Sequence, residues 1–188
     1  MLGINRVRAM HAAESSALLS LTDALLDEVT QDQRFRAEDL QDYHRRWLGD
    51  IYPWAGKCRQ VNIARRGFQF ASAQLIPRLM ADYDRDVLAT QTPCAGMNAE
   101  RLSHALARTH AEFILIHPFR EGNGRLARLL NSLMAWQAGL PALDYGGIRG
   151  REKQAYIAAI HRAMDRDYAP LERMFSAVIA RTLRTVEP

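Results

Sequence analysis

The chain has 188 residues, 48% of them hydrophobic and 24% charged, which is enough for one domain with its own core and argues against a disordered chain. Its net charge is +4, but most arginines are scattered without interleaved aromatic residues, so we expect a solvated basic surface and neither a nucleic-acid nor a membrane partner. No apolar run approaches the roughly 20 residues of a membrane span, and the N-terminus lacks a secretory signal pattern. The only cysteines, Cys58 and Cys94, have no metal-ligand spacing. We therefore expect a cytoplasmic protein.

Apolar residues at helical spacing predict the first two helices. In the first, they recur at intervals of three and four: Leu18, Leu21, Leu25 and Val29, with Leu19 and Leu26 widening the stripe. This pattern predicts a helix over residues 12–29. A second helix is predicted over residues 37–48, because Glu38 and Asp39 fall in its first turn, where the helix dipole favours acids.

The next segment alternates between apolar and polar residues instead. The apolar residues lie on either side of a basic turn: Val61 and Ile63 before Arg65-Arg66-Gly67, and Phe68 and Phe70 after it. The alternation predicts a β-hairpin within residues 57–71. A hairpin of two strands is marginal by itself, so we expect it to lean on the helices.

Helical patterns fill the rest of the chain. Ser72 is predicted to cap a helix that ends near residue 89, and Asn98 to cap a helix over residues 99–116. Another helix opens near Gly122 and ends at about residue 138, and two more are predicted at about residues 151–165 and 170–185. The sequence therefore predicts a mostly α domain with one small β-hairpin.

Residues 117–128 read HPFREGNGRLAR and place a glycine-rich turn before a helix. The predicted core face of that helix consists of Leu126, Leu129, Leu130, Leu133 and either Trp136 or Gln137. Arg125 and Arg128 lie three residues apart on another face, so both can reach one site. The first N–H groups of a helix lack partners, and glycines leave them accessible to a ligand. This combination predicts a site for a polyphosphate.

Two further side chains of this stretch suggest chemistry. Glu121 would repel phosphates unless a divalent cation lies between them, which suits a Mg²⁺–nucleotide complex; the alternative is an acid that complements the helix dipole. His117 could act as a base that makes a hydroxyl nucleophilic. A structural role is the alternative, and we assign that role to the other histidines: His11, His44, His104, His110 and His161. Phe119 is predicted to point into the core.

The stretch resembles, position for position, the signature HxFx(D/E)GNGRxxR of the Fic (Fido-fold) family. The signature positions are occupied by His117, Phe119, Glu121, Gly122, Asn123, Gly124, Arg125 and Arg128. The likeness extends to IYPWAGKCRQVNI at 51–63 and GFQFA at 67–71, which resemble the family's flap region, and covers roughly residues 37–176. It implies a single Fic domain over residues 1–188, with a helical bundle, a hairpin flap and an N-terminal helix.

The resemblance also implies a protein adenylyltransferase, which transfers AMP from ATP to a Ser, Thr or Tyr hydroxyl of a target protein and releases pyrophosphate. His117 would be the general base, and Glu121 would hold Mg²⁺. The phosphates would be bound by Gly122, Asn123, Gly124, Arg125 (β-phosphate) and Arg128 (γ-phosphate). The flap would dock the target as an added strand through Val61, Ile63, Arg65, Gly67 and Phe68, unless Arg65 and Arg66 simply protect a sheet edge. Tyr156 would help to shape the adenine pocket.

Two alternatives to AMP transfer stay open at this point. The same fold can transfer another phosphate-linked group, such as UMP, phosphate or phosphocholine. The other alternative is a nucleotide-binding interaction module without catalytic activity.

Many family members carry an inhibitory helix with the motif (S/T)xxxE(G/N), whose Glu side chain binds the second arginine of the signature. The only Glu-Gly pair in this sequence is Glu121-Gly122. We therefore hypothesise a toxin restrained by a separate small antitoxin-like protein, or a domain cut from a longer protein.

Overall fold

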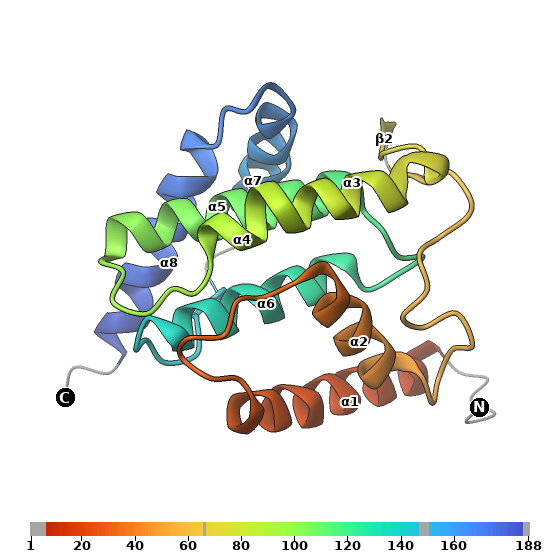
Figure 1. The fold of residues 1–188 in the computed structure, drawn as a ribbon, viewed down its shortest axis with the longest axis horizontal. Helices are drawn as coiled ribbons and strands as arrows, with labels where there is room; N and C mark the ends of the chain where they lie inside the picture. Colours follow the sequence, from red (N-terminus) through yellow and green to blue (C-terminus); the bar gives the residue numbers. More distant parts are fainter. Residues whose placement is uncertain (1–6, 66, 147–150, 186–188) are drawn as a thin grey trace.

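The computed structural model describes residues 7–65, 67–146 and 151–185, and these residues are mostly helical. Helix α5 (Ala99–Ile116) is the central element (Figure 1). The helices that pack against it are α3 (Ile76–Tyr83), α6 (Asn123–Gln137), α7 (Arg151–Arg162) and α8 (Ala169–Arg184). One hydrophobic core runs from Leu21 near the start of the chain to Ile179 in α8.

The two N-terminal helices pack on each other and on α6. Figure 1 shows α1 (Val7–Glu28) along the lower edge, with α2 (Ala37–Leu48) between it and α6. The predicted bounds of α2 are confirmed, whereas α1 already includes Val7, five residues before the predicted start. Leu21 and Leu25 are buried as predicted, but Leu19 is 64% exposed, so its place in the apolar stripe was wrong.

The hairpin is shorter than predicted. Strands β1 (Ala64–Arg65) and β2 (Phe68–Gln69) pair antiparallel, and the Phe70 N–H extends the pairing to the Ile63 carbonyl at 3.2 Å. Val61 lies outside the strands and is 53% exposed, so the prediction that it belongs to the paired hairpin is corrected. The physical reason is that the Arg59 side chain, rather than a partner strand, takes up the carbonyl of Val61 at 2.7 Å.

The helix predicted after Ser72 is interrupted. It consists of η1 (Ala73–Leu75), α3, the π-helical turn η2 (Asp84–Leu88) and α4 (Ala89–Gln91). Ser72 makes no capping hydrogen bond through its side chain, and the Ala73 N–H is satisfied by Asn62 Oδ1 at 2.9 Å instead. Within η2, Asp84 accepts a hydrogen bond from the Ala37 N–H at 2.7 Å and so ties this helix to α2.

The remaining helices follow the predictions closely. Asn98 Oδ1 accepts from the Arg101 N–H at 2.9 Å, which confirms the predicted cap of α5. The predicted core residues of α6 are buried: Leu126, Leu129, Leu130, Leu133 and Gln137. A short turn, η3 (Ala163–Asp165), follows α7. Across the described residues, no helix combines the length and the apolarity that crossing a lipid bilayer requires.

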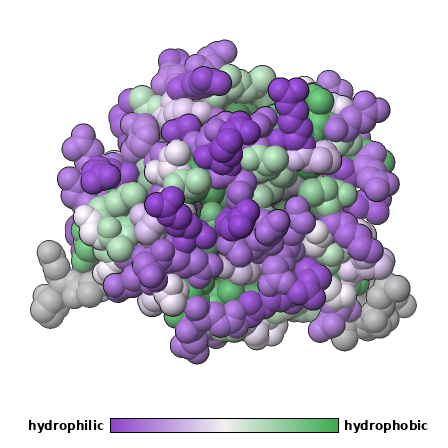
Figure 2. Space-filling view, viewed as in Figure 1, coloured by the Kyte–Doolittle hydropathy of each residue, from purple (hydrophilic) through white to green (hydrophobic). Residues whose placement is uncertain are grey.

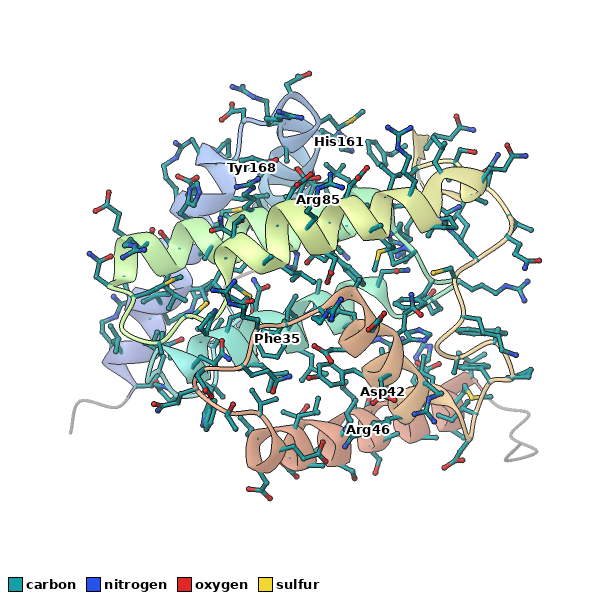
Figure 3. All side chains as sticks on the ribbon, viewed as in Figure 1. Phe35, Asp42, Arg46, Arg85, His161 and Tyr168 are labelled. Atoms are coloured by element: carbon teal, nitrogen blue, oxygen red, sulfur yellow. The ribbon has the colours of Figure 1, made fainter. Side chains whose placement is uncertain are left out.

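Polar side chains dominate the surface. The face in Figure 2 is covered mainly by hydrophilic residues, with small hydrophobic patches between them. Figure 3 shows Asp42 and Arg46 on α2, and Arg46 reaches Glu28 of α1 at 2.7 Å. Exposed ion pairs of this kind contribute only about 0–1 kcal/mol, so the buried core is the main source of stability.

Candidate functional site

Residues 117–122 form a tight turn between α5 and α6, and buried side chains beneath the turn stabilise its conformation. Phe119 is buried, as predicted, and stacks on the His44 ring with 3.9 Å between the centroids. Asn123 Oδ1 accepts from the Phe119 N–H at 2.9 Å, and Asn123 Nδ2 donates to the Phe119 carbonyl at 2.8 Å. The Asn123 side chain is therefore used within the turn, and the expectation that Asn123 contacts phosphates stays a prediction that concerns its backbone N–H.

His44 fixes the turn from the side of α2. Its Nδ1 accepts a hydrogen bond from the Gly56 N–H at 2.8 Å, so its Nε2 carries the proton and donates to the Glu121 carbonyl at 3.1 Å. Burial lowers the pKa of His44 to about 4, which keeps the imidazole neutral at neutral pH. This arrangement agrees with the predicted structural role of His44.

Gly122, at the end of the turn, and Gly124, in the first turn of α6, are glycines for different reasons. Gly122 has φ of 87°, and a Cβ atom there would lie 2.8 Å from the buried Trp47 ring. Gly124 has an ordinary helical conformation, and a Cβ atom there would meet nothing within 4 Å. Gly122 is thus required by the fold, whereas Gly124 keeps the space over the start of α6 open.

His117 ends α5 in a left-handed conformation, with φ of 51°. Its Nδ1 lies 3.2 Å from the Ile114 carbonyl, which can only accept, so Nδ1 carries the proton and Nε2 keeps its lone pair. Phe70 stacks on the ring at 3.7 Å. Burial lowers the pKa of His117 to about 4; the charges of Arg59 and Arg65 act in the same direction, and the Ile114 carbonyl and Glu121 oppose it.

Most of the predicted site residues line one cavity of about 970 Å³. Its walls include His117, Glu121, Gly122, Gly124, Arg125 and Arg128. Both arginines therefore border one space, as their spacing in the sequence predicted. Arg128 is exposed, while the Arg125 guanidinium lies over the Trp47 ring, 4.6 Å from its centroid.

Glu14 of α1 also lines this cavity, and the sequence interpretation missed it. Its side chain is only 4% exposed; Oε2 accepts from Arg125 at 2.6 Å and Oε1 accepts from the Tyr52 hydroxyl at 2.6 Å. Burial by itself would raise the pKa of Glu14, but the hydrogen bonds from Tyr52 and Arg125 and the charge of Arg125 outweigh it and lower the pKa. A signal existed in the sequence: Glu14 continues the spacing of Leu18, Leu21 and Leu25.

The hairpin and α7 also line the cavity. Arg65, Phe68 and Phe70 line the cavity from the hairpin side, and Tyr156 lines it from α7. Phe68 stacks on His161 of α7 at 4.5 Å, and Figure 3 places His161 on that helix. Two of the predicted flap residues, Arg65 and Phe68, thus border the cavity, whereas Val61 and Ile63 are not among its lining residues.

A sequence profile of the Fic/DOC family matches residues 34–135. The protein adenylyltransferase VbhT of Bartonella schoenbuchensis is 28% identical over 183 residues, covering 97% of this chain and 36% of the relative. The protein adenylyltransferase fic-1 of Caenorhabditis briggsae is 32% identical over 159 residues, covering 84% of this chain and 29% of the relative. The chain therefore spans about a third of the length of these relatives.

Solved structures show the same architecture. The N-terminal FIC domain of Bep8 from Bartonella sp. 1-1C matches with a TM-score of 0.75 at 18% identity, covering 94% of this chain and 88% of that one. BepC from Bartonella tribocorum, solved with bound AMPPNP, matches with a TM-score of 0.71 at 19% identity, covering 94% and 89%. The predicted fold class, a mostly helical Fic fold with a small antiparallel hairpin, is confirmed.

Proposed function

The chain is a member of the Fic/DOC family, and we propose that it transfers AMP from ATP to a hydroxyl side chain of another protein. The observation that supports this best is the single cavity bordered by His117, Glu121, the start of α6 and both arginines. The relatives VbhT and fic-1 bear the name protein adenylyltransferase, which favours the same reaction.

In the proposed reaction, His117 Nε2 accepts the proton of a Ser, Thr or Tyr hydroxyl of the target. The hydroxyl oxygen bonds to the α-phosphorus of ATP while the bond from that phosphorus to the bridging oxygen breaks, so that pyrophosphate leaves. The Ile114 carbonyl favours this role, because it keeps the proton of the neutral ring on Nδ1. The low pKa of the imidazole keeps it in its basic form at neutral pH.

The phosphates would lie over the start of α6. Its first N–H groups offer hydrogen bonds to an anion, and the open space at Gly124 lets a phosphate approach them. Arg125 would then bind the β-phosphate and Arg128 the γ-phosphate, each by charge-assisted hydrogen bonds. The protein would act mainly by positioning the nucleotide and neutralising its charge.

Glu121 would hold the Mg²⁺ ion that accompanies ATP. Its side chain lies at the cavity, and more than half of its surface is exposed. Within residues 7–65, 67–146 and 151–185, no three His, Cys, Asp or Glu side chains form a metal cluster. A single carboxylate fits Mg²⁺, which takes its other ligands from phosphate oxygens and water and, when bound, neutralises phosphate charge.

The flap would dock the target segment as an added strand. A two-stranded hairpin offers unpaired N–H and C=O groups along an edge, and Arg65 and Phe68 lie at the cavity beside that edge. Val61, Ile63 and Gly67, which lie beside the two strands, would complete this docking edge. The alternative role for Arg65 is to keep other strands from pairing with this sheet edge. Arg66, which was predicted to share that role, lies outside the described residues.

Residues 1–188 would form one Fic domain, with a core at about 37–176. The continuous hydrophobic core supports this, and Glu14 of α1 reaches into the cavity. We also propose that a separate antitoxin-like protein restrains the enzyme, with a regulatory segment of a longer protein as the alternative; among residues 1–188 the only Glu-Gly pair lies within the 117–128 stretch itself. Co-purification with a small helical protein encoded in the same operon would support this, and free activity in the presence of all operon products would refute it.

Mass spectrometry tests the main proposal. Lysate proteins incubated with the chain, Mg²⁺ and isotopically labelled ATP should gain the mass of AMP on a Ser, Thr or Tyr residue. Competition among labelled ATP, UTP and CDP-choline separates AMP transfer from transfer of UMP or phosphocholine, and a gain of phosphate alone would indicate a kinase. Absence of any modification, with nucleotide still bound, would favour a catalytically silent module.

A further inference from the structure

Arg59 carries a buried charge that the proposed reaction does not use. The residue lies between α2 and the hairpin and is only 2% exposed. A buried cation is costly unless its donors are satisfied, and a guanidinium offers five donors in a fixed fork. The contacts of this fork therefore indicate what the residue does.

Four hydrogen bonds of the guanidinium go to backbone carbonyls, and these belong to two separate segments. On the flap side, Nη1 donates to the Val61 carbonyl at 2.7 Å and Nη2 to the Ala71 carbonyl at 2.6 Å. On the side of the turn, Nε donates to the His117 carbonyl at 2.8 Å and Nη2 to the Ile116 carbonyl at 3.3 Å. One planar group thus joins the two ends of the flap, at Val61 and Ala71, to the end of α5.

The backbone of Arg59 strengthens the same junction. Its N–H donates to the Pro118 carbonyl at 2.8 Å, so three consecutive carbonyls, 116 to 118, accept from this residue. His117 between them has φ of 51°, a conformation that costs free energy for a residue with a side chain. The hydrogen bond to its carbonyl helps to hold that conformation, which sets the direction of the imidazole.

The stack between the imidazole and Phe70 involves the same two backbone segments. Phe70 stacks on His117 at 3.7 Å, and Arg59 binds the carbonyl of His117 and that of Ala71, the residue after Phe70. Both rings of the stack are therefore held through their own backbone segments by one guanidinium. A flap that shifts without Arg59 would move Phe70 relative to the imidazole.

We propose that Arg59 is a positioning residue, which holds the His117 imidazole in register with the flap and hence with a hydroxyl docked there. The inference rests on the proposed function, because it assigns the imidazole to proton transfer. Lysine cannot replace arginine in this role, since a single ammonium group cannot span carbonyls of both segments in one plane.

Arg59→Lys is the main test, because it keeps the positive charge and loses the fork. We expect kcat for AMP transfer to fall about a hundredfold, since a displacement of about 1 Å in a reacting group has an effect of that size. The KM for ATP and the affinity for ADP should stay unchanged, because Arg59 is not among the residues that line the cavity. Unchanged kcat in the folded variant, or a parallel loss of ADP affinity, would overturn the proposal.

Arg181→Lys is the matched control. This guanidinium also donates to a backbone carbonyl, that of Asp144, at 2.9 Å, but it lies on α8 and does not line the cavity. The control should change stability without changing kcat. An equal loss of kcat in both variants would show that any weakened carbonyl contact slows the enzyme, and would overturn a specific role for Arg59.

Nuclear magnetic resonance provides a readout that does not depend on transfer. The imidazole protons of His117 should carry a ring-current shift from Phe70, and Arg59→Lys should remove most of it. Arg59→Met adds the loss of charge and should also raise the pKa of His117, with Arg65 and Glu121 left as the charged groups that face the ring. If the wild-type protein transfers no AMP, the proposed function is refuted. The positioning role of Arg59 is tested separately: loss of the ring-current shift in Arg59→Lys supports it, and retention of the shift refutes it.

Discussion

The turn at 117–122 and the flap at 61–70 both border the cavity and meet where Phe70 stacks on His117, but they are held very differently. The turn is held by buried contacts: the two hydrogen bonds of Asn123, the His44 contact to Glu121, and Gly122 against Trp47. The flap tip has two residue pairs of strand and two aromatic stacks. The comparison indicates a firmly held turn next to a hairpin tip with few restraints, and the proposed nucleotide and target sites would fall on these two parts.

Removal of the imidazole should have the largest effect. We expect His117→Ala to slow AMP transfer about 10²- to 10⁴-fold, the usual contribution of a general base, and to leave ADP affinity intact because the phosphate contacts remain. Single-turnover transfer and ADP titration measure the two quantities. Transfer at the wild-type rate would remove His117 from the role of base.

The two glycines offer a matched pair that separates fold from ligand space. Gly122→Ala should destabilise the protein by about 2–4 kcal/mol, because the φ of 87° and the Trp47 contact both oppose a Cβ atom. Gly124→Ala should leave the free energy of unfolding unchanged or raise it by up to about 1 kcal/mol, but it should weaken ADP binding. Urea unfolding and ADP titration test both; equal destabilisation would contradict the distinction.

Loss of Glu14 should destabilise the rigid side of the cavity. Glu14→Ala leaves Arg125 and Tyr52 without their shared acceptor, at a cost of about 1–3 kcal/mol. Because the pKa of Glu14 lies below its usual 4.5, its contribution should be present above that pH and be lost as the pH falls through the lowered pKa. Unfolding at several pH values measures this, with exposed Asp23→Ala as the control on the same helix.

Arg128 should matter for one phosphate only. Arg128→Ala should weaken ATP binding about tenfold, the effect of losing a charge-assisted contact, and should weaken AMP binding much less. Calorimetric titration of ATP, ADP and AMP gives the comparison. Equal weakening of all three nucleotides would remove Arg128 from the γ-phosphate.

The smallest effect on stability is expected in the flap. Phe68→Ala removes the stack on His161 and should change the free energy of unfolding by less than about 1 kcal/mol. It should raise the KM for the target protein without changing the KM for ATP. A change in the KM for ATP alone would place Phe68 at the nucleotide and not at the target.

Local patterns in the sequence were enough to predict most of the helices, although not the early start of α1 or the interrupted helix after Ser72. The bounds of α2 and α5 and the Asn98 cap depend on residues within a few positions of each other, where spacing and capping are decisive. The 117–128 stretch was found for the same reason, since its turn, its arginines and its histidine are contiguous. The resemblance to the Fic family then added the roles of individual residues.

Long-range contacts explain what the sequence interpretation missed. Glu14 meets Arg125 across 111 positions, and Arg59 meets His117 across 58. Neither distance leaves a local pattern, although the place of Glu14 in an apolar stripe was a visible anomaly. The hairpin was predicted too long because a side chain, Arg59, replaced the expected strand pairing at Val61. The docking role of the flap stays a prediction.

The Trp47 side chain of α2 contacts three other parts of the chain. Its Nε1 donates to the Glu14 carbonyl at 2.8 Å, its ring supports Arg125, and its edge limits what can stand at position 122. A smaller residue at position 47 would at once loosen the N-terminal helix, remove the ring that supports the Arg125 guanidinium and leave a void beside the turn. Positions 14, 47 and 122 should therefore change together over evolutionary time, or not at all.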